Sequence, residues 1–369
     1  MKILIITKRQ YTNKDLLDDQ YGRLWEIPLH LAALGHQIKG ICLSYRSKEK
    51  NNHFRSKNKQ LEWYSFNIFS EFLLYFFKLH KFINSFKPEI ILASSDCYHI
   101  ILGYFLAKLY KIPCILDIYD NYEYFKASAL PGVKPLYHRA LKKANAISCS
   151  SKPLKHKLLQ EYQTTGLIAV IENAVDTALF KPQKQKLCRA YFGLPNNIKI
   201  IGTAGALQQS RGIQNLYSAF EILAQQDDCV HLAVAGNGSR KNSVFQHPKI
   251  HDFGVLDYQD IPLFLGMLDV AVICNSNNGF GHYCYPQKAN EILACNVPLI
   301  AADVGVMHAL LSEYPECLFN ANEFTGIAEK IKRQIVKPSI LKIKVHTWKT
   351  QAESLEKIIR SVVSKTKFS

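Results

Sequence analysis

The sequence predicts an α/β protein made of two Rossmann-like domains that face each other across a cleft. Three observations lead to this prediction. Short apolar strands alternate with helix-like segments, as they do in parallel sheets built from right-handed crossovers. The alternation restarts once, after FKP at 180–182. The 369 residues, 48% of them hydrophobic, provide enough material for two cores.

The first series opens with a buried strand, KILIIT (2–7), and a helical stretch near 22–35. Further strand-like runs follow, each separated by a helix-like segment: QIKGICL (37–43), EIILAS (89–94), PCILDIY (113–119) and NAISCSS (145–151). We place the N-terminal Rossmann-like domain at residues 1–178.

The second series repeats this rhythm with a new set of apolar runs. Its strands are IKIIGTAG (198–205), CVHLAVAG (229–236), LDVAVIC (268–274) and VPLIAAD (297–303). We place the C-terminal Rossmann-like domain at 179–346. The remaining residues, 347–369, contain a helix-like stretch too short for a third domain, and we expect it to pack back on the N-terminal domain.

The charge balance predicts an anionic partner. Lys and Arg outnumber Asp and Glu by 46 to 30, a formal charge of +16, which suits nucleotides, nucleic acid or acidic phospholipid. Nucleic acid is disfavoured because the chain has no helix-turn-helix, zinc-finger or RNA-binding aromatic signature. The basic run at 46–60, RSKEKNNHFRSKNKQ, is either a solvated loop or a surface that meets lipid phosphates.

The cysteines and the hydrophobic runs indicate the compartment. The ten cysteines include no Cys-x-x-Cys pair and no disulfide framework, which is typical of an intracellular protein. The opening MKILIITKRQ is a first strand rather than a signal peptide. The most hydrophobic run, FLLYFF at 72–77, is far shorter than the roughly 20 residues of a membrane span. We therefore expect a cytoplasmic protein, soluble or attached only at the inner face of the cytoplasmic membrane.

Glycines after the first strand of each series mark candidate ligand loops, since ligands of parallel sheets bind beyond the carboxyl ends of the strands. The first series offers Gly22 and Arg23, and the second offers Gly205 and then Arg211 before a helix. Neither loop has the Gly-x-Gly-x-x-Gly spacing of a nicotinamide or flavin fingerprint. Arg211 alone could equally be a surface charge.

The stretch GFGHYCYPQKANEILACNVPLIAADVGV at 279–306 carries the most information about function. Pro286 suits the first position of a helix. The following amides and the positive end of the helix dipole then form an anion site, to which Lys288 adds a full charge. Glu291 lies about one and a half turns further in, where its carboxylate can accept hydrogen bonds from two sugar hydroxyls. A nucleotide fits both the anion site and the carboxylate, with its phosphate at the helix start and its ribose on Glu291. The alternative is a buried helix with a solvated glutamate.

This stretch resembles the donor-binding signature of the family-4 retaining glycosyltransferases, which have the GT-B fold. The opening KILIIT…GRLWEIPLHLAALGHQI resembles the first strand, loop and helix of the family. Other similar segments occur in the expected order: IENAVDTALFKP (171–182), GTAGALQQSRGIQNLYSAFEIL (202–223) and HLAVAGNGS (231–239). The resemblance therefore extends along nearly the whole chain.

The resemblance implies roles for individual residues. Glu291 matches the second glutamate of the Glu-x7-Glu motif, which holds the donor ribose, and Arg211 matches the basic residue that neutralises the diphosphate. Lys288 belongs to a Pro-x-Lys-x-x-Glu variant and is expected to be a second phosphate contact. The expected donor-binding residues are Gly22, Arg23, Gly205, Arg211, Gly281, His282, Tyr283, Lys288 and Glu291.

Three positions depart from the family pattern. Tyr283 stands where the first glutamate of the pair would touch the transferred sugar, and Ala206 stands in place of a second basic residue. Ala174 replaces the glycine of an Asn-Gly pair. Sugar recognition is then expected to depend on Phe280, His282, Tyr283 or Tyr285.

The resemblance also implies the chemistry, which needs no metal and no cofactor beyond the donor substrate. Arg211 and Lys288 are expected to offset charge on the leaving diphosphate. The first domain would hold the acceptor, and the run PCILDIYDNYEYF (113–125) supplies Asp120 as the expected catalytic acid with Glu123 behind it. Asp117 could equally be a helix cap.

A UDP-sugar is favoured over a GDP-sugar as donor, and a glycan or lipid-linked molecule in cell-surface polysaccharide synthesis is the expected acceptor. The alternatives are a catalytically silent protein that binds a nucleotide sugar or a partner enzyme, and a non-hydrolysing nucleotide-sugar epimerase. The aromatic stretch at 64–82 and the basic run at 46–60 predict peripheral contact with an anionic membrane; alternatively, the aromatics form core.

Overall fold

The structure is a computed structural model that describes residues 1–11, 14–46, 52–238, 247–339 and 341–367. The chain forms two compact units. Unit 1 comprises Met1–Asn173 together with the C-terminal helix that starts at Trp348, and unit 2 comprises Ala174–Thr347. The boundary between the units therefore falls before the predicted position at 178.

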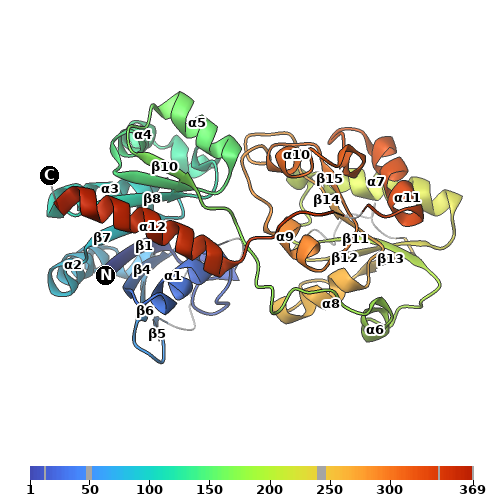
Figure 1. Cartoon of the computed structure of the whole chain (residues 1–369), viewed down its shortest axis with the longest axis horizontal. Helices are drawn as coiled ribbons and strands as arrows, with labels where there is room; N and C mark the ends of the chain where they lie inside the picture. The colour runs from blue at the N-terminus through green and yellow to red at the C-terminus, as the bar shows by residue number, and fades with distance from the viewer. Residues whose placement is uncertain (12–13, 47–51, 239–246, 340, 368–369) are drawn as a thin grey trace. The chain divides into compact units, whose positions relative to one another are not determined.

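Unit 1 is built on a largely parallel sheet with helices on both faces (Figure 1). The strand order is β10-β9-β8-β7-β1-β4-β6-β5, and only β5 runs antiparallel to its neighbour. The strands are β1 (Lys2–Lys8), β4 (Gln37–Ser44), β5 (His53–Arg55), β6 (Leu61–Asn67), β7 (Ile90–Ser94), β8 (Cys114–Ile118), β9 (Ala146–Cys149) and β10 (Leu167–Val170). A short antiparallel pair, β2 (Gln10–Tyr11) and β3 (Lys14–Asp15), follows β1.

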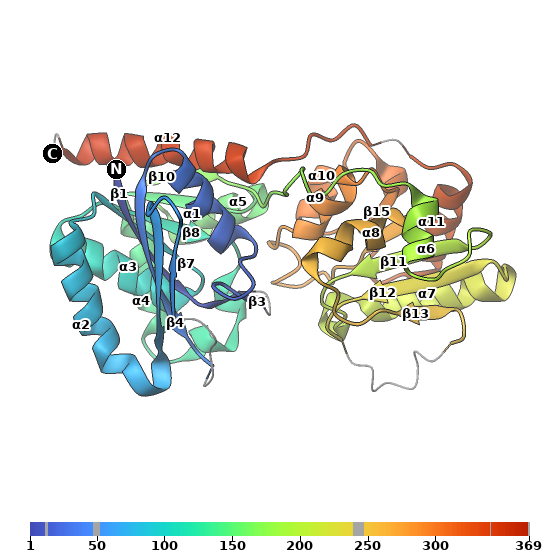
Figure 2. The ribbon, with the colours of Figure 1, turned by 90° about the horizontal axis from the view of Figure 1, so that it is seen from below.

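The helices of unit 1 divide between the two faces of this sheet. They are α1 (Arg23–Ala33), α2 (Ile68–Phe86), α3 (Cys97–Tyr110), α4 (Val133–Lys143), α5 (Lys152–Tyr162) and α12 (Trp348–Lys367), with short 3₁₀ turns η1 (Tyr122–Tyr124) and η2 (Lys126–Ala129). Figure 2 shows α1 and α12 on one side of the sheet and α2, α3 and α4 on the other. The crossovers before β7, β8 and β9 all run in the same direction across the sheet, and right-handed connections therefore put α2, α3 and α4 on one face.

Strand β6 was not among the predicted strands; part of it falls in the aromatic stretch at 64–82, which was interpreted as a membrane-contacting surface or as core. It pairs with β4 in parallel, and Trp63 lies opposite Gly40 in this register. Trp63 is fully buried, and a Cβ on Gly40 would lie 2.1 Å from its ring. Glycine is therefore required at position 40, because the indole occupies the space of any side chain.

Helix α12 belongs to unit 1 although it is the last element of the chain. It packs against α1, and its Glu356 carboxylate lies 3.0 Å from Nε2 of the buried His36. Trp348, Leu355 and Ile359 are buried on its inner side. The apolar stripe of α12 thus completes the core beside α1.

Unit 2 is also built on a parallel sheet, with strand order β13-β12-β11-β14-β15-β16. The strands are β11 (Lys199–Ala204), β12 (Val230–Ala235), β13 (Ile250–Asp252), β14 (Val270–Ile273), β15 (Leu299–Ala302) and β16 (Leu318–Phe319). The helices are α6 (Gln185–Tyr191), α7 (Ile213–Gln226), α8 (Ile261–Gly266), α9 (Gln287–Ala294), α10 (Val306–Leu310) and α11 (Phe324–Val336), and the 3₁₀ turns are η3 (Gln209–Arg211), η5 (Tyr258–Asp260) and η6 (Pro315–Cys317).

Two apolar clusters cover the two faces of the sheet of unit 2. One joins the sheet to α7 and α11 through residues such as Phe220 and Ile331. The other joins it to α8 and α9 through residues such as Phe264 and Ile292. The apolar strands predicted in the second series are therefore buried on both faces, and the prediction of two Rossmann-like α/β domains is confirmed.

Candidate functional site

The start of α9 brings backbone amides to the carboxyl ends of the strands of unit 2. The helix begins at Gln287, one residue later than predicted, because Pro286 occupies the N-cap and not the first helical position. Within the described residues, no side chain caps this end. The first-turn amides and the positive end of the helix dipole are therefore suited to an anionic ligand.

Lys288 adds a full positive charge beside this helix start. Its Nζ donates to the carbonyl oxygen of Ala204, the last residue of β11, over 3.3 Å. The next residue, Gly205, has φ +118°, and a Cβ there would lie 3.9 Å from the Nζ. Burial lowers the pKa of Lys288, and the charge of Arg211 lowers it further. An anion bound here would oppose both effects and stabilise the charged form.

Arg211 lies at the end of η3, directly before Gly212, the N-cap of α7. Its guanidinium carbon sits 4.1 Å from the centre of the Phe280 ring, in the range of a cation–π contact. Phe280 belongs to the glycine-rich loop before α9, so this contact connects the two segments that carry the predicted phosphate ligands. The structure thus brings Arg211 and Lys288 into one site.

Glu291 is a buried carboxylate in the same helix as Lys288. Its side chain is 7% exposed, and Oε1 accepts a hydrogen bond from Nε2 of Gln287 over 3.1 Å. Burial raises the pKa of Glu291 to about 7, against the smaller opposing effects of Gln287 and Lys288. Hydroxyl groups that donated to this carboxylate would offset the cost of its burial.

The glycine-rich loop is held in shape by the side chain of Asn278 and by close backbone packing. Oδ1 of Asn278 accepts from the amides of Phe280 and Gly281 over 3.0 and 2.8 Å. A Cβ on Gly281 would lie 2.1 Å from the carbonyl oxygen of Ser276. Gly281 is therefore required by this turn, and its contact with the donor stays a prediction. The following residues, His282 and Tyr283, stack edge to face with ring centroids 4.9 Å apart.

The glycine turn after β11 packs directly against the turn after β12. Gly205 donates from its amide to the carbonyl of Ala235 over 2.8 Å. Gly236 has φ +137°, and a Cβ there would lie 1.7 Å from the carbonyl oxygen of Gly205. The position of Gly205 therefore depends on Gly236, which the sequence analysis did not single out.

Two further polar residues lie at the same strand ends and were also missed. Thr203 is in β11, and Asn275 follows β14. Among the described residues, Oγ1 of Thr203 and Nδ2 of Asn275 are buried atoms with no hydrogen-bond partner. Such atoms are costly unless something else satisfies them, so both are candidates for contact with a polar ligand. A Thr and an Asn at strand ends are too common to have been recognised from sequence.

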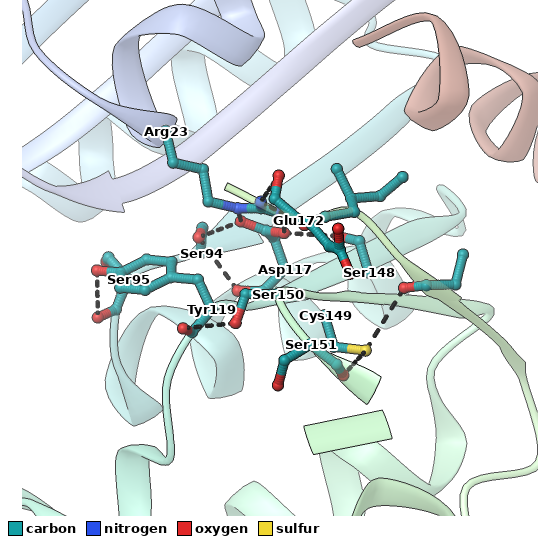
Figure 3. A network of polar contacts seen from close by, with 12 residues as sticks. Arg23, Ser94, Ser95, Asp117, Tyr119, Ser148, Cys149, Ser150, Ser151 and Glu172 are labelled. Atoms are coloured by element: carbon teal, nitrogen blue, oxygen red, sulfur yellow. Dashed lines mark hydrogen bonds and ion pairs between the residues drawn. The ribbon is translucent and has the colours of Figure 1, made fainter. Parts of the chain in front are cut away.

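Arg23 has a different position from the one predicted. Its side chain is 2% exposed and lies in a buried polar network of unit 1 (Figure 3). The guanidinium donates to both carboxylate oxygens of Asp117 over 2.6 and 3.0 Å, and to the carbonyl of Ile171 over 2.6 Å. The Arg23 side chain therefore binds the interior of unit 1, which corrects its assignment to the donor site.

Asp117 is the centre of this network rather than a helix cap. Besides Arg23, it accepts from the hydroxyls of Ser94 and Ser148 over 2.9 and 2.6 Å. Burial alone would raise the pKa of Asp117, but the charge of Arg23 and these hydrogen bonds lower it. The network joins strands β7, β8 and β9 at their carboxyl ends, and Gly22, with φ 74°, starts α1 beside Arg23.

Ser95 has an unusual backbone at the same edge of the sheet. Its φ of 97° is rare for a residue with a side chain. Its hydroxyl accepts from the amide of Lys8 over 2.8 Å, and its carbonyl accepts from the Tyr119 hydroxyl over 3.2 Å. These contacts hold the start of α3, where Asp96 is the N-cap. No sequence signal pointed to this conformation.

The two acids expected to serve the reaction lie after β8. Asp120 is half-buried, and its Oδ1 accepts from the amide of Asn121 over 2.8 Å. Glu123 accepts from Nε2 of His138 over 2.6 Å and from the hydroxyl of Tyr162. Burial would raise the pKa of Glu123, but Tyr162 and His138 lower it. Glu123 thus links η1 to α4 and α5, and its catalytic role stays a prediction.

The described residues contain neither a metal-binding cluster nor a membrane-spanning helix. No group of three or more His, Cys, Asp or Glu side chains within them is arranged to hold a metal ion. Within the same part of the chain, no helix has both the length and the apolar character to cross a membrane.

Two family models match the chain, one in each unit. Residues 24–179 match the model of glycosyltransferase family 4, and residues 198–336 match that of the glycosyl transferases group 1. The chain belongs to the family-4 glycosyltransferases. The predicted resemblance is therefore confirmed, and the paired Rossmann-like units are those of the GT-B fold.

Two curated relatives resemble parts of this family-4 chain. Alpha-monoglucosyldiacylglycerol synthase of Streptococcus pneumoniae is 24% identical over 205 residues, which cover 52% of this chain and 45% of the relative. TuaC of Bacillus subtilis, a glycosyltransferase named for teichuronic acid biosynthesis, is 25% identical over 242 residues, or 62% of this chain and 58% of the relative. The chain thus matches about half the length of each relative.

Solved structures share the fold of this family-4 chain along its length. Sucrose-phosphate synthase from Thermosynechococcus elongatus superimposes with a TM-score of 0.79 at 15% identity, over 99% of each chain. Anabaena HepE in complex with UDP and glucose has a TM-score of 0.72 at 16% identity, over 98% of this chain and 100% of HepE. UDP-GlcNAc 2-epimerase from Methanocaldococcus jannaschii has 0.60 at 14% identity, over 98% and 100%. At these identities the likeness concerns the fold alone.

Proposed function

We propose that this chain is a retaining glycosyltransferase that moves a sugar from a nucleotide-diphosphate sugar to a glycan or lipid-linked acceptor in cell-surface polysaccharide synthesis. The observation that carries the proposal is the meeting of two cations, Arg211 and Lys288, at the start of α9, with the buried carboxylate of Glu291 in the same helix. Two cations suit a diphosphate, and a carboxylate with raised pKa suits a ribose diol.

The same groups can assist bond cleavage. As the bond between the anomeric carbon and the diphosphate oxygen breaks, negative charge grows on the diphosphate. Arg211, Lys288 and the amides at the start of α9 are already in place to stabilise that charge, which makes them an electrostatic catalyst. The acceptor hydroxyl attacks on the same face, and its proton passes to the leaving diphosphate oxygen, so configuration is retained.

Uracil is the preferred base of the donor. The support comes from relatives in fold, since the HepE structures carry UDP, UDP and glucose, or UDP-glucose. The acceptor class is supported by the names of the two curated relatives, one a glycolipid synthase and the other a teichuronic acid glycosyltransferase. A cytoplasmic protein in peripheral contact with an anionic membrane fits both acceptor classes.

Thermal denaturation in the presence of nucleotides tests the donor first. We expect UDP and UDP-sugars to raise the midpoint of unfolding by mass action more than GDP or GDP-sugars do. A panel of UDP-sugars with polyprenyl-phosphate-linked and diacylglycerol acceptors then tests transfer. A chain that is stabilised by neither nucleotide, and releases neither from its sugar, would contradict the proposal.

A silent nucleotide-sugar-binding protein is the second candidate. Tyr283 in place of the first glutamate favours it, because the residue expected to touch the transferred sugar is absent. Binding of UDP-sugar without release of UDP, with or without any acceptor, would support this candidate instead.

A further inference from the structure

Helix α2 presents large apolar side chains to solvent at regular spacing. Phe69, Leu73 and Phe77 are 75%, 74% and 74% exposed. Leu73 and Phe77 are four residues apart on the helix that follows a kink at Glu71, so they point the same way. Phe69 lies in the short first turn before the kink. Tyr75, on the inner side, is buried. The expectation that these aromatics are core therefore holds only for the inner side of the helix.

The start of this helix is fixed by its cap. Oδ1 of Asn67 accepts from the amide of Phe69 over 2.9 Å, and the amide of Asn67 donates to the Glu71 carboxylate over 2.9 Å. This is a reciprocal capping arrangement. The exposed Phe69 is thus part of an ordered first turn and is held at the surface by local structure.

Helices α3 and α4 lie on the same side of the sheet as α2 (Figure 2), and they also carry exposed apolar residues. His80 of α2 is hydrogen-bonded to Tyr110 of α3, and α3 packs against α4. Exposed apolar residues on these elements, and just before α4, are Phe105, Leu109, Leu130 and Leu136. We name the outer surface of α2, α3 and α4 the α2–α4 face.

The α2–α4 face is also strongly basic. The three helices carry Lys78, Lys81, Lys108, Lys134, Arg139, Lys142 and Lys143, and their single acidic residue is Glu71. The structure describes the predicted basic run at 46–60 only in part. Residues 47–51 lie outside the described residues, and Arg55 within it is paired with Glu62 over 2.8 Å.

We propose that the α2–α4 face docks on an anionic lipid bilayer. Phenylalanine and leucine side chains would enter the boundary between headgroups and acyl chains, and the lysines would meet lipid phosphates. A second copy of the chain is a poorer occupant, because two such faces would place like charges opposite each other. Only the purpose of docking rests on the proposed function: it would bring unit 1 to a lipid-linked acceptor.

Flotation with phospholipid vesicles tests the face without any need for turnover. We expect the native chain to float with vesicles containing phosphatidylglycerol and much less with phosphatidylcholine vesicles. High salt should reduce flotation with the phosphatidylglycerol vesicles, because it screens the attraction between lysines and lipid phosphates. The triple variant Phe69→Glu, Leu73→Glu, Phe77→Glu should reduce the bound fraction at limiting lipid by at least about tenfold. Because the replaced side chains are largely exposed, folding should survive, which the unchanged unfolding midpoint would verify.

A matched control separates this face from exposed apolar residues in general. Leu187 and Val336 are 65% and 85% exposed on α6 and α11 of unit 2, and their change to Glu should leave flotation unaltered. Equal loss in both variants, or equal flotation of the native chain and the triple variant, would overturn the proposal. A concentration-dependent dimer that the triple variant abolishes, with no flotation, would assign the face to a second copy instead.

The outcome is distinguishable from failure of the proposed function. Flotation without binding of UDP would support the docking proposal and contradict the glycosyltransferase proposal. Transfer of sugar to a soluble acceptor without flotation would support the proposed function and contradict the docking proposal.

Discussion

The side chain of Lys288 reaches from α9 to the carbonyl oxygen of Ala204 at the end of β11, 3.3 Å away. This hydrogen bond places the ammonium group over the turn made by Gly205, in a site where burial lowers its pKa. A cation held at low dielectric interacts strongly with a bound anion. The relationship gives a physical reason for a lysine three residues before Glu291, the glutamate that we propose binds the donor ribose.

Removal of either cation should slow transfer more than it weakens binding. Arg211→Ala and Lys288→Ala are each expected to lower kcat by about 10²–10³-fold, because charge on the diphosphate is greatest in the transition state. Initial rates of UDP release from the donor measure this effect. Lys186, exposed on α6, provides the control, and Lys186→Ala should match the native rate. Native kinetics in both site variants would remove the donor-site assignment.

Glu291→Ala should act mainly on nucleotide affinity. Loss of a buried acceptor for ribose hydroxyls is expected to cost about 1–3 kcal/mol of binding free energy. Calorimetric titration with UDP and with uridine measures the loss, which should be similar for both ligands because both contain the ribose. An effect on UDP alone would instead place Glu291 at the phosphates.

The pH dependence of donor binding should report the same carboxyl. The pKa of Glu291 is raised to about 7, and its charged form is the better acceptor, so affinity for UDP-glucose should rise as pH increases through this value. UDP-glucose is the suitable ligand because it has no terminal phosphate that titrates in this range. Glu291→Gln should flatten the profile, and an identical slope in both proteins would assign the titration to another group.

Arg23→Met should destabilise unit 1 and leave nucleotide binding intact. It would strand the buried Asp117 carboxylate, at a cost of about 3–5 kcal/mol. The three tryptophans, Trp25, Trp63 and Trp348, all lie in unit 1, so urea unfolding followed by tryptophan fluorescence reports on this unit. Asp117→Asn in the same chain should recover part of the loss. Weaker UDP binding at unchanged stability would restore the original donor assignment of Arg23.

Asp120→Asn should reduce transfer while donor affinity stays the same. If the charge aligns the acceptor or supports the developing positive charge on the sugar, the rate should fall by about 10²-fold or more. Glu123→Gln is the comparison, and it should lower stability more than rate, since Glu123 binds His138 and Tyr162. Parallel loss of donor affinity in Asp120→Asn would make Asp120 structural.

Local sequence pattern was sufficient for most of the architecture but not for long-range polar pairing. Short apolar runs predicted the buried parallel strands. Pro286 and the residues after it predicted the start of α9. Strand β6 was missed because its stability depends on the contact between Trp63 and Gly40 of another strand. The same limitation explains Arg23 and Asp117, which are 94 positions apart and meet only in the folded sheet.

The candidate site was predictable where charge and helix geometry coincide, as at Lys288 and Glu291. It was not predictable where packing decides the role. Gly281 is fixed by the carbonyl of Ser276, and Gly205 by Gly236, and neither contact leaves a mark in the local sequence. The unsatisfied atoms of Thr203 and Asn275 became apparent only from burial.

The assignment of α12 to unit 1 has a consequence for how the chain is made. Unit 2 is an insertion within unit 1, because the chain leaves unit 1 after Asn173 and returns at Trp348. During synthesis, the strands and helices of unit 2 emerge completely before the helix that covers α1. The first unit to begin is therefore the last to be finished, and until α12 arrives its apolar surface beside α1 is exposed to chaperones and proteases.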